Sequence, residues 1–381
     1  MPLGQDEVVP TLAVRGGSVD VLIEGERIVA PASGLEAGAT LDATGCQVFP
    51  GFIDLQCNGG FGVDFTTSPD DAHVVAARLP ETGVTSFLPT IITAPENVIV
   101  RAVTELDILC RESPGARSLG VHVEGPFINP LRGGAHPLRH IRPPDVAEAS
   151  RWTAAGRVAM VTLAPELDRA LDLVAVLRTA GVVVSCGHCD MSIAELDDAV
   201  AVGATAATHL YNAMGTMSAR APGSAGAVLA NRSLMAGIIA DGLHVSPEMI
   251  AIAWRMLGPD RLFLVTDAIA ALGLPHGPFR VGDTVVHVDE EGPRTVRGVL
   301  AGSVLRMDEA VRNLIAFTGC TTAEAVAAAT TNSARLLGRS DVGVLQPGAY
   351  ADVVLLDGDN RVAATVAGGR VLFDPEQRLS S

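Results

Sequence analysis

Apolar runs of strand length recur through the middle of the chain, and segments with a helical pattern separate most of them. The eight runs span residues 49–56, 85–93, 118–126, 158–166, 182–188, 204–212, 235–244 and 262–268. Several intervening segments, such as 69–83, 166–181 and 193–203, end on glycine as helices often do. Strands that alternate with helices indicate a parallel sheet with crossover helices. Eight such units favour a closed (β/α)8 TIM-type barrel, although an open doubly wound sheet would show the same alternation.

The two ends of the chain have a different pattern, with short alternating strands broken at glycine. Residues 12–48 read as short strands, and the tail from about residue 343 repeats this pattern with Pro-Gly, Asp-Gly and Gly-Gly breaks. Two β-rich ends around a long middle predict one small β-sandwich domain formed by both chain termini. We therefore expect residues 1–48 and 343–381 to form this domain and residues 49–342 to form the barrel.

Composition and charge are those of a folded protein that does not bind nucleic acid. The chain has 381 residues, enough for a barrel of about 250 residues and a satellite domain. Hydrophobic residues make up 48% of it and charged residues 18%, a globular balance. A net charge of −16 opposes binding to a nucleic-acid backbone, which takes clustered Lys and Arg. An anionic substrate would therefore need a local basic site.

The sequence predicts neither a membrane span nor a secreted protein. No stretch approaches roughly 18 consecutive apolar residues, and Met1–Pro10 carries neither a basic residue nor an apolar run. The six cysteines are sparse and scattered, which favours a reducing cytoplasm over a disulfide framework. Cys186 and Cys189 form a CxxC pair around His188. A redox or structural-zinc use of this pair stays open beside an ordinary place in the core.

The rare polar residues of the middle region fall where the apolar runs end. Glu124 lies at the end of the third run, His188 ends the fifth, and His209 lies near the end of the sixth. In a closed βα barrel the carboxyl ends of all strands meet on one face, so these residues converge. One Glu and two His suit Zn²⁺, or Fe²⁺, Co²⁺ or Mn²⁺, and leave a coordination position open. A lone His is more often a core residue, but convergence on strand ends favours the metal site.

Hydrolysis at such a site also needs an acid/base group close to the metal. Asp267, at the end of the eighth run, is the candidate that takes a proton from water and returns it to the leaving amine. An Asp after a strand is also a favoured helix N-cap, so that alternative stays open. His244 could polarise the scissile carbonyl, whereas Asp241 in an Asp-Gly pair also fits a simple turn.

A series of motifs, taken in order, carries a family resemblance. They are PGFIDLQCNGG, HVEGPFIN with GAH, CGHCD, THLYNAM followed by RAPG, GIIADGLH, LVTDA and LAGS. Together they run from about residue 49 to 337, and the chain resembles the N-acetylglucosamine-6-phosphate deacetylase family of the amidohydrolase superfamily. The resemblance implies metal-dependent removal of the acetyl group from N-acetylglucosamine 6-phosphate, a small phosphorylated amino sugar.

The resemblance also implies a role for individual residues. Glu124, His188 and His209 would be the metal ligands, Asp267 the acid/base, and His244 a substrate ligand beside the metal. The sugar-phosphate pocket would be lined by Ala135, His136, Asn212, Ala213, Asp241, Gly242, Leu243, His244, Leu300, Ala301 and Gly302.

A phosphate ligand and an oligomeric state follow from the same likeness. Arg220 would pair with the phosphate and would reach it from the neighbouring subunit of a homodimer. A guanidinium fork suits a phosphate dianion, and an acidic chain needs a local positive site for one. The alternative is that Arg220 is a solvated loop charge.

The chain departs from the wider superfamily at two places. Many members carry His-x-His on the first strand to bind a second metal, whereas Gln56 and Asn58 occupy these positions here. Neutral amides are weak ligands, so we expect one tightly bound divalent ion per chain, with Zn²⁺ as the first choice. Ala221 follows Arg220 where the family often has Glu, which leaves the hydrogen bonding around the arginine open.

Two other functions compete with this one. The first is an amidohydrolase that acts on another N-acyl amino-sugar phosphate, such as N-acetylgalactosamine 6-phosphate. Arg220 and the GAH loop favour a phosphorylated amino sugar but do not fix the epimer. The second is a barrel that has lost catalysis and serves as a scaffold, and the presence of Glu124, His188, His209 and Asp267 argues against it.

Overall fold

The computed structural model describes residues 11–30, 37–109, 112–113 and 115–380. Met1–Pro10, on which the expectation of no signal peptide rests, lies outside the described residues, as does Cys110. The proposed division into residues 1–48, 49–342 and 343–381 stays a prediction.

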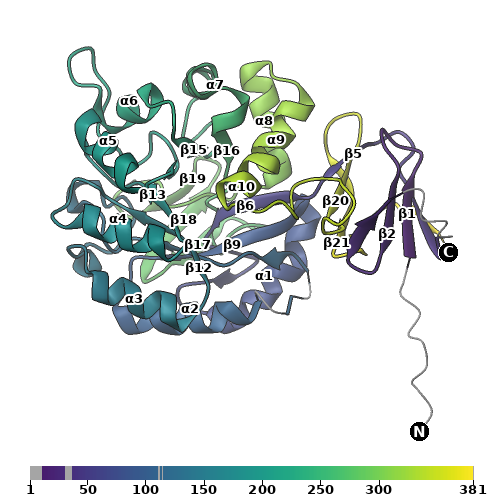
Figure 1. The fold of residues 1–381 in the computed structure, drawn as a ribbon, viewed down its shortest axis with the longest axis horizontal. Coiled ribbons are helices and arrows are strands. Elements are labelled where there is room, and N and C mark those ends of the chain that lie inside the picture. Colours follow the sequence, from purple (N-terminus) through teal and green to yellow (C-terminus); the bar gives the residue numbers. More distant parts are fainter. Residues whose placement is uncertain (1–10, 31–36, 110–111, 114, 381) are drawn as a thin grey trace, which may run out of the picture.

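Eight parallel strands form a barrel at the centre of the larger part of the molecule (Figure 1). They are β6 (Phe52–Cys57), β9 (Val84–Ile92), β11 (Val121–Glu124), β12 (Val158–Leu163), β13 (Val183–Cys186), β14 (Ala206–Ala207), β15 (Met235–Ile238) and β16 (Leu262–Leu264), with β10 (Arg117–Ser118) as a short addition beside β9. Residues after β16 close the ring onto β6. The Asp267 N–H donates to the Gln56 carbonyl at 2.8 Å, and the Asn58 N–H donates to the Ala268 carbonyl at 2.7 Å. The expected (β/α)8 TIM-type barrel is confirmed.

Helices cover the outside of the barrel (Figure 1). They are α1 (Ala72–Arg78), α2 (Glu96–Leu109), α3 (Val146–Ala155), α4 (Ala170–Thr179), α5 (Ile193–Val202), α6 (Gly223–Ala230), α7 (Pro247–Arg261), α8 (Met307–Thr318), α9 (Thr322–Ala329) and α10 (Thr331–Leu336), with short 3-10 turns η2 (Pro69–Asp71), η3 (Leu79–Thr82), η4 (Pro130–Arg132) and η5 (Leu138–His140). Local sequence explains their limits. In α5, for example, Ser192 and Glu195 form a capping box at the start, and Gly203 caps the end.

The first apolar run, residues 49–56, is divided between two sheets. β5 (Gln47–Pro50) pairs with β20 (Val353–Leu356) outside the barrel, and β6 begins at Phe52. Gly51 lies at the break, where a Cβ would overlap the Thr85 side chain. The expectation of a single strand over 49–56 is therefore wrong.

Both ends of the chain build a separate part with two sheets, seen beside the barrel in Figure 1. One sheet has the order β23 (Leu379–Ser380), β4 (Ala39–Asp42), β1 (Thr11–Arg15), β2 (Val21–Glu24) and β3 (Arg27–Val29), and the other β22 (Arg370–Phe373), β21 (Val362–Ala367), β20 and β5. Side chains from both sheets, such as Val14, Ile23, Leu355 and Val366, share one buried cluster. The chain termini thus form the small sandwich expected from their alternating strands.

A three-stranded antiparallel sheet that the sequence analysis did not anticipate lies between β16 and α8. It consists of β17 (Gly277–Val281), β18 (Thr284–Asp289) and β19 (Gly292–Thr295). Val281 and Val286 pack with Ile92 and Ile269 in a small core of their own. A two-strand hairpin, β7 (Gly59–Gly60) with β8 (Val63–Asp64), follows β6. Both additions lie where strands end, so they build up the rim of the barrel.

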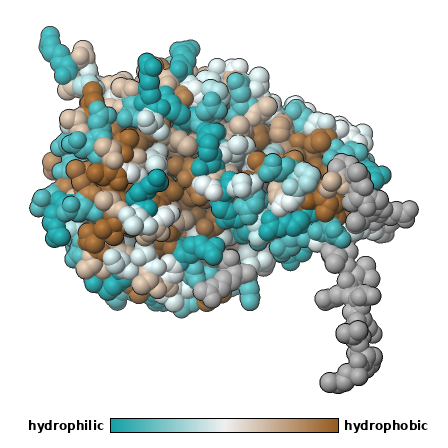
Figure 2. All heavy atoms as spheres, in the orientation of Figure 1, coloured by the Kyte–Doolittle hydropathy of each residue, from teal (hydrophilic) through white to brown (hydrophobic). Residues whose placement is uncertain are grey.

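The surface mixes hydrophobic and hydrophilic residues over the face shown in Figure 2. Single apolar side chains such as Val176 on α4 and Ile193 on α5 are exposed. Within the part of the chain that the structure describes, no helix is both long and apolar enough to cross a membrane.

Candidate active site

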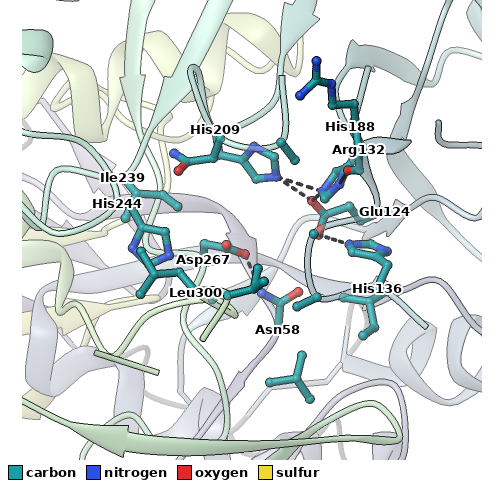
Figure 3. A pocket seen from close by; sticks show the side chains of 18 of the residues that line it. Asn58, Glu124, Arg132, His136, His188, His209, Ile239, His244, Asp267 and Leu300 are labelled. Atoms are coloured by element: carbon teal, nitrogen blue, oxygen red, sulfur yellow. Dashed lines mark hydrogen bonds and ion pairs between the residues drawn. The ribbon is translucent and has the colours of Figure 1, made fainter. Parts of the chain in front are cut away.

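Polar side chains gather at the carboxyl ends of the barrel strands, where a cavity of about 290 Å³ opens (Figure 3). Glu124 is the last residue of β11. His188 and His209 follow β13 and β14 by two residues each, and Asp267 follows β16 by three. All four side chains line the cavity. The convergence expected from strand ends far apart in sequence is therefore present.

Glu124, His188 and His209 bring three ligand atoms to one point. Glu124 Oε1 lies 3.2 Å from His188 Nε2 and 3.0 Å from His209 Nε2, and the two Nε2 atoms are 3.1 Å apart. The three residues are at most 4% exposed. Among the described residues, no second group of His, Cys, Asp and Glu side chains converges in this way.

The hydrogen bonds around this cluster show that it suits a cation. His188 Nδ1 lies 2.9 Å from the Arg132 carbonyl oxygen, so Nδ1 carries the proton and Nε2 turns a lone pair toward Glu124. His209 Nδ1 has no hydrogen-bond partner. A buried carboxylate oxygen and imidazole lone pairs at this spacing are costly unless a cation joins them. The three residues therefore fit a divalent metal, for which carboxylate and imidazole are ordinary ligands.

Asp267 is held close to this cluster by two amide side chains. Its Oδ1 accepts hydrogen bonds from Asn58 Nδ2 at 2.6 Å and from Gln56 Nε2 at 3.1 Å. Gln56 Nε2 also donates to Glu124 Oε1 at 3.0 Å. Gln56 thus donates to both carboxylates, whereas Asn58 donates to Asp267.

The environment of Asp267 separates the two interpretations of this residue. Burial and the nearby charge of Glu124 raise the pKa of Asp267 to about 6. No helix begins between Asp267 and α8, a stretch that the structure describes throughout. The helix-cap alternative is therefore wrong, and Asp267 is a cavity residue with the proton affinity that an acid/base needs.

Asp54 fixes the backbone that carries Asp267, and the sequence analysis did not single it out. Its carboxylate accepts hydrogen bonds from the Thr266 N–H at 3.2 Å, the Thr266 hydroxyl, and the Gln56 N–H at 3.2 Å. Asp54 lies fully buried within β6, and burial raises its pKa to about 7. A charged residue inside an otherwise apolar run was the signal that could have revealed it.

Several site residues have left-handed backbone conformations that residues other than glycine rarely adopt. The φ angle is 49° at His188, 29° at His209, 51° at Ala213 and 52° at Asp267. Each such residue costs on the order of 1–3 kcal/mol and persists only where the surrounding structure enforces it. Their concentration at one cavity supports a functional role for this cavity.

His136 of the GAH loop adds a neutral imidazole to the wall beside Glu124. Its Nδ1 lies 2.7 Å from the Thr93 hydroxyl oxygen, and its Nε2 lies 3.8 Å from Glu124 Oε2. Burial, and then the nearby His188, lower the pKa of His136 to about 3, so its ring is neutral. It can therefore exchange hydrogen bonds with a ligand without adding charge.

Asp241 forms a turn and orients His244. Its Oδ1 accepts from the backbone N–H groups of Leu243 and His244 at 2.8 Å each, while Oδ2 lies 2.7 Å from His244 Nδ1. The turn interpretation of the Asp-Gly pair is therefore correct. With Nδ1 directed at Asp241, His244 presents the rest of its ring to the cavity that it lines.

Most positions implied by the resemblance line this cavity, and some do not. Those that line it are Ala135, His136, Asn212, Ala213, His244, Leu300 and Gly302. Asp241, Gly242, Leu243 and Ala301 do not belong to its lining, and Arg220 lies on an exposed loop outside it. Arg132 does line it, and sequence reasoning missed this residue. The available signal was a basic residue two positions before the GAH motif, which begins at Gly134.

Cys186 and Cys189 do not take part in the ligand cluster. Both are free thiols with no exposed surface, and burial raises the pKa of Cys189 to about 12. A thiol that stays protonated is a poor nucleophile and a poor metal ligand. Their burial supports an ordinary place in the core.

The barrel, the Glu and His cluster at its strand ends that fits a divalent metal, and the adjacent carboxylate are the features of a metal-dependent hydrolase. A profile of the amidohydrolase family matches residues 47–372. The N-acetylglucosamine-6-phosphate deacetylase of Bos taurus is 38% identical over 387 residues, covering 96% of this chain and 94% of that protein. The deacetylase of the same name from Lysinibacillus sphaericus is 35% identical, covering 94% of each chain. The chain belongs to the N-acetylglucosamine-6-phosphate deacetylase family of amidohydrolases.

Solved structures agree with this assignment over the whole fold. An N-acetyl-D-glucosamine-6-phosphate deacetylase from Mycobacterium smegmatis, in complex with N-acetyl-D-glucosamine-6-phosphate, has a TM-score of 0.85 and 34% identity. The match covers 96% of this chain and 99% of that chain. The deacetylase from Pasteurella multocida has a TM-score of 0.87 at 28% identity, covering 95% and 99%.

Proposed function

We propose that this protein hydrolyses the N-acetyl group of N-acetylglucosamine 6-phosphate to give glucosamine 6-phosphate and acetate. The observation that carries the proposal is the convergence of Glu124, His188 and His209 within 3.2 Å of one another. Asp267, the carboxylate suited to proton transfer, lines the same cavity. Relatives that match the chain over nearly its full length carry the name of this activity.

The metal in this proposal is one Zn²⁺ per chain, held by Glu124, His188 and His209. When bound, such an ion supplies a Lewis acid that polarises the amide carbonyl and activates water. The choice of Zn²⁺ rests on the types of the three ligands. The number of ions rests on Gln56 and Asn58. These two amides are engaged by the carboxylates and offer no imidazole to a second ion.

The side chains of the protein move the proton and hold the substrate. Asp267 takes a proton from the attacking water and returns it to the leaving amine, and its raised pKa suits both steps. His244, which Asp241 Oδ2 orients through Nδ1 at 2.7 Å, donates from its other ring nitrogen to the carbonyl oxygen as negative charge develops there. His136 and Asn212 line the cavity, where they bind the sugar. The leaving group departs as a neutral amine.

The oligomer and the compartment also belong to this proposal. Arg220 lies outside the cavity of its own chain, which supports its placement at the phosphate of a neighbouring subunit in a homodimer. The five described cysteines are free and buried, which supports a reducing compartment such as the cytoplasm.

Acetate release and metal analysis test this function directly. Purified protein should contain about one divalent ion per chain and should release acetate from N-acetylglucosamine 6-phosphate far faster than from N-acetylglucosamine. N-acetylgalactosamine 6-phosphate in the same assay measures how strictly the epimer is selected. Absence of acetate release from all three sugars by metal-loaded protein would contradict the proposed function.

A further inference from the structure

Arg132 supplies positive charge to the cavity, and neither the metal cluster nor the acid/base accounts for it. It is the last residue of η4, in the loop that follows β11. Among the described residues that line the cavity, it is the sole Lys or Arg. In Figure 3 its side chain extends away from Glu124, on the far side of His188. Its charge therefore lies at a different part of the cavity from the carboxylates.

Two contacts fix the position of Arg132. Its backbone carbonyl oxygen accepts the hydrogen bond from His188 Nδ1 at 2.9 Å. Its guanidinium NH2 group donates to Asp190 Oδ2 at 3.0 Å, and the Asp190 N–H itself donates to Glu166 Oε1 at 2.6 Å. The guanidinium is thus anchored beside a metal ligand and is not a freely moving surface charge.

In this position the Arg132 guanidinium still has an N–H donor without a partner. Arg132 Nε is buried and has no hydrogen-bond partner. A buried donor on a charged group carries a desolvation cost until an acceptor reaches it, and a guanidinium offers five N–H donors in all. Glu124 and Asp267, the other charged groups of the cavity lining, would repel an anion. An anionic ligand would therefore be drawn to Arg132.

We propose that Arg132 is a phosphate ligand contributed by the same chain, and that Asp190 is the positioning residue that holds it. The inference rests on the proposed function and deepens it, because it assigns a residue that selects the 6-phosphorylated sugar over the unphosphorylated one. Guanidinium and phosphate form charge-assisted hydrogen bonds of matching geometry. A phosphate group has enough oxygens to be bound by Arg132 and by a second arginine at once.

The test compares kcat/KM for N-acetylglucosamine 6-phosphate with kcat/KM for N-acetylglucosamine. Arg132→Ala should lower this ratio by about tenfold to a hundredfold, in line with the loss of charge-assisted hydrogen bonds. Arg132→Lys, which keeps the charge but not the fork, should lower it less. Asp190→Asn should lower it through KM for the phosphorylated sugar, with a smaller change in kcat.

Arg139→Ala is the matched control. Arg139 follows the GAH loop, is 65% exposed in its ion pair with Asp283, and does not line the cavity. The substrate ratio should not change in this variant. Metal content should also persist in Arg132→Ala, because His188 bonds to the backbone of residue 132 and not to its side chain.

Inorganic phosphate serves as a probe that does not depend on catalysis. Calorimetric titration of the metal-loaded protein with phosphate should give a Kd at least about tenfold weaker in Arg132→Ala and in Arg132→Gln than in the wild type. Equal losses on both sugars, or an unchanged ratio with unchanged phosphate affinity, would overturn the role of Arg132. If the wild type releases no acetate but the phosphate affinities still differ, the proposed function fails and the anion site stands.

Discussion

Asp267 is held by Asn58 and Gln56, and its substitution by asparagine removes the acid/base while leaving the acceptor for both amides. We expect Asp267→Asn to lower kcat by at least about a hundredfold, the usual contribution of a positioned acid/base. Metal content and the free energy of unfolding should change little, because the new side chain keeps Oδ1. Acetate release and metal analysis on the same sample check this. A near-normal kcat would show that another residue is the base, and Asp241 would be tested next.

His188 contributes one of the three atoms of the proposed metal site, so its substitution should lower metal affinity. His188→Ala should lower both the metal content after dialysis and the activity, because Glu124 and His209 alone form an incomplete set. His73→Ala, on the exposed side of α1, is the control and should retain the metal. Two equally tight ions per wild-type chain would contradict the single-metal prediction.

At the scale of residues, the convergence of Glu124, His188 and His209 could be predicted because a Glu or His that ends an apolar strand stands out from its surroundings. The role proposed for Arg132 could not be predicted, because it depends on an ion pair with Asp190, 58 positions further along the chain. The hydrogen bonds of Gln56 to Glu124 and Asp267 were hidden for the same reason. They join residues from three different strand ends.

Asp352 joins two strands of the small sandwich through a buried carboxylate. It lies just before β20, and its Oδ1 accepts the N–H of Gly368, which follows β21, at 2.8 Å. Its Oδ2 has no partner, and burial raises the pKa of Asp352 to about 6. The folded state therefore binds this proton more tightly than the unfolded state. The contribution of the carboxyl to stability is greatest below about pH 4 and is lost as pH rises through about 6.

Removal of this buried carboxyl should thus raise the free energy of unfolding more at neutral pH than in acid. Asp352→Asn keeps an oxygen acceptor for Gly368. Relative to the wild type, its free energy of unfolding should be greater at pH 7 than at pH 4.5 by about 1–3 kcal/mol. Denaturant unfolding of both proteins at both pH values measures the difference. Asp198→Asn on the exposed face of α5 is the control. If Asp352→Asn raised the free energy of unfolding equally at both pH values, the raised pKa of Asp352 would be contradicted.

At the scale of elements, periodicity identified the strands but not always their partners. Residues 49–56 looked like one strand, yet β5 pairs with β20 and β6 pairs with β9, and Gly51 separates the two strands. The sheet formed by β17, β18 and β19 was missed because β17 and β18 each bury few side chains. Such a sheet is stabilised by packing on Ile92 and Ile269, which local sequence does not record.

At the scale of the molecule, the barrel could be predicted because eight strand and helix units leave few alternatives. The proposed homodimer could not be derived in this way. It comes from the family resemblance, and Arg220 is exposed and lies outside the cavity of its own chain. If Arg220 serves the neighbouring site, each active site contains residues from two chains, and defects in different chains should complement one another.

Hybrid dimers of Arg220→Ala chains and His188→Ala chains test this arrangement. Each variant alone should be impaired, the first in phosphate binding and the second in metal binding. In a hybrid, one site combines the intact ligands of the first chain with the arginine of the second, so it should work normally. Random mixing makes about half of the dimers hybrid and restores about a quarter of all sites. Activity on N-acetylglucosamine 6-phosphate should therefore rise toward about a quarter of the wild-type value after mixing. Proven hybrids without this gain would place Arg220 outside the neighbouring site and leave Arg132 as the arginine at the phosphate.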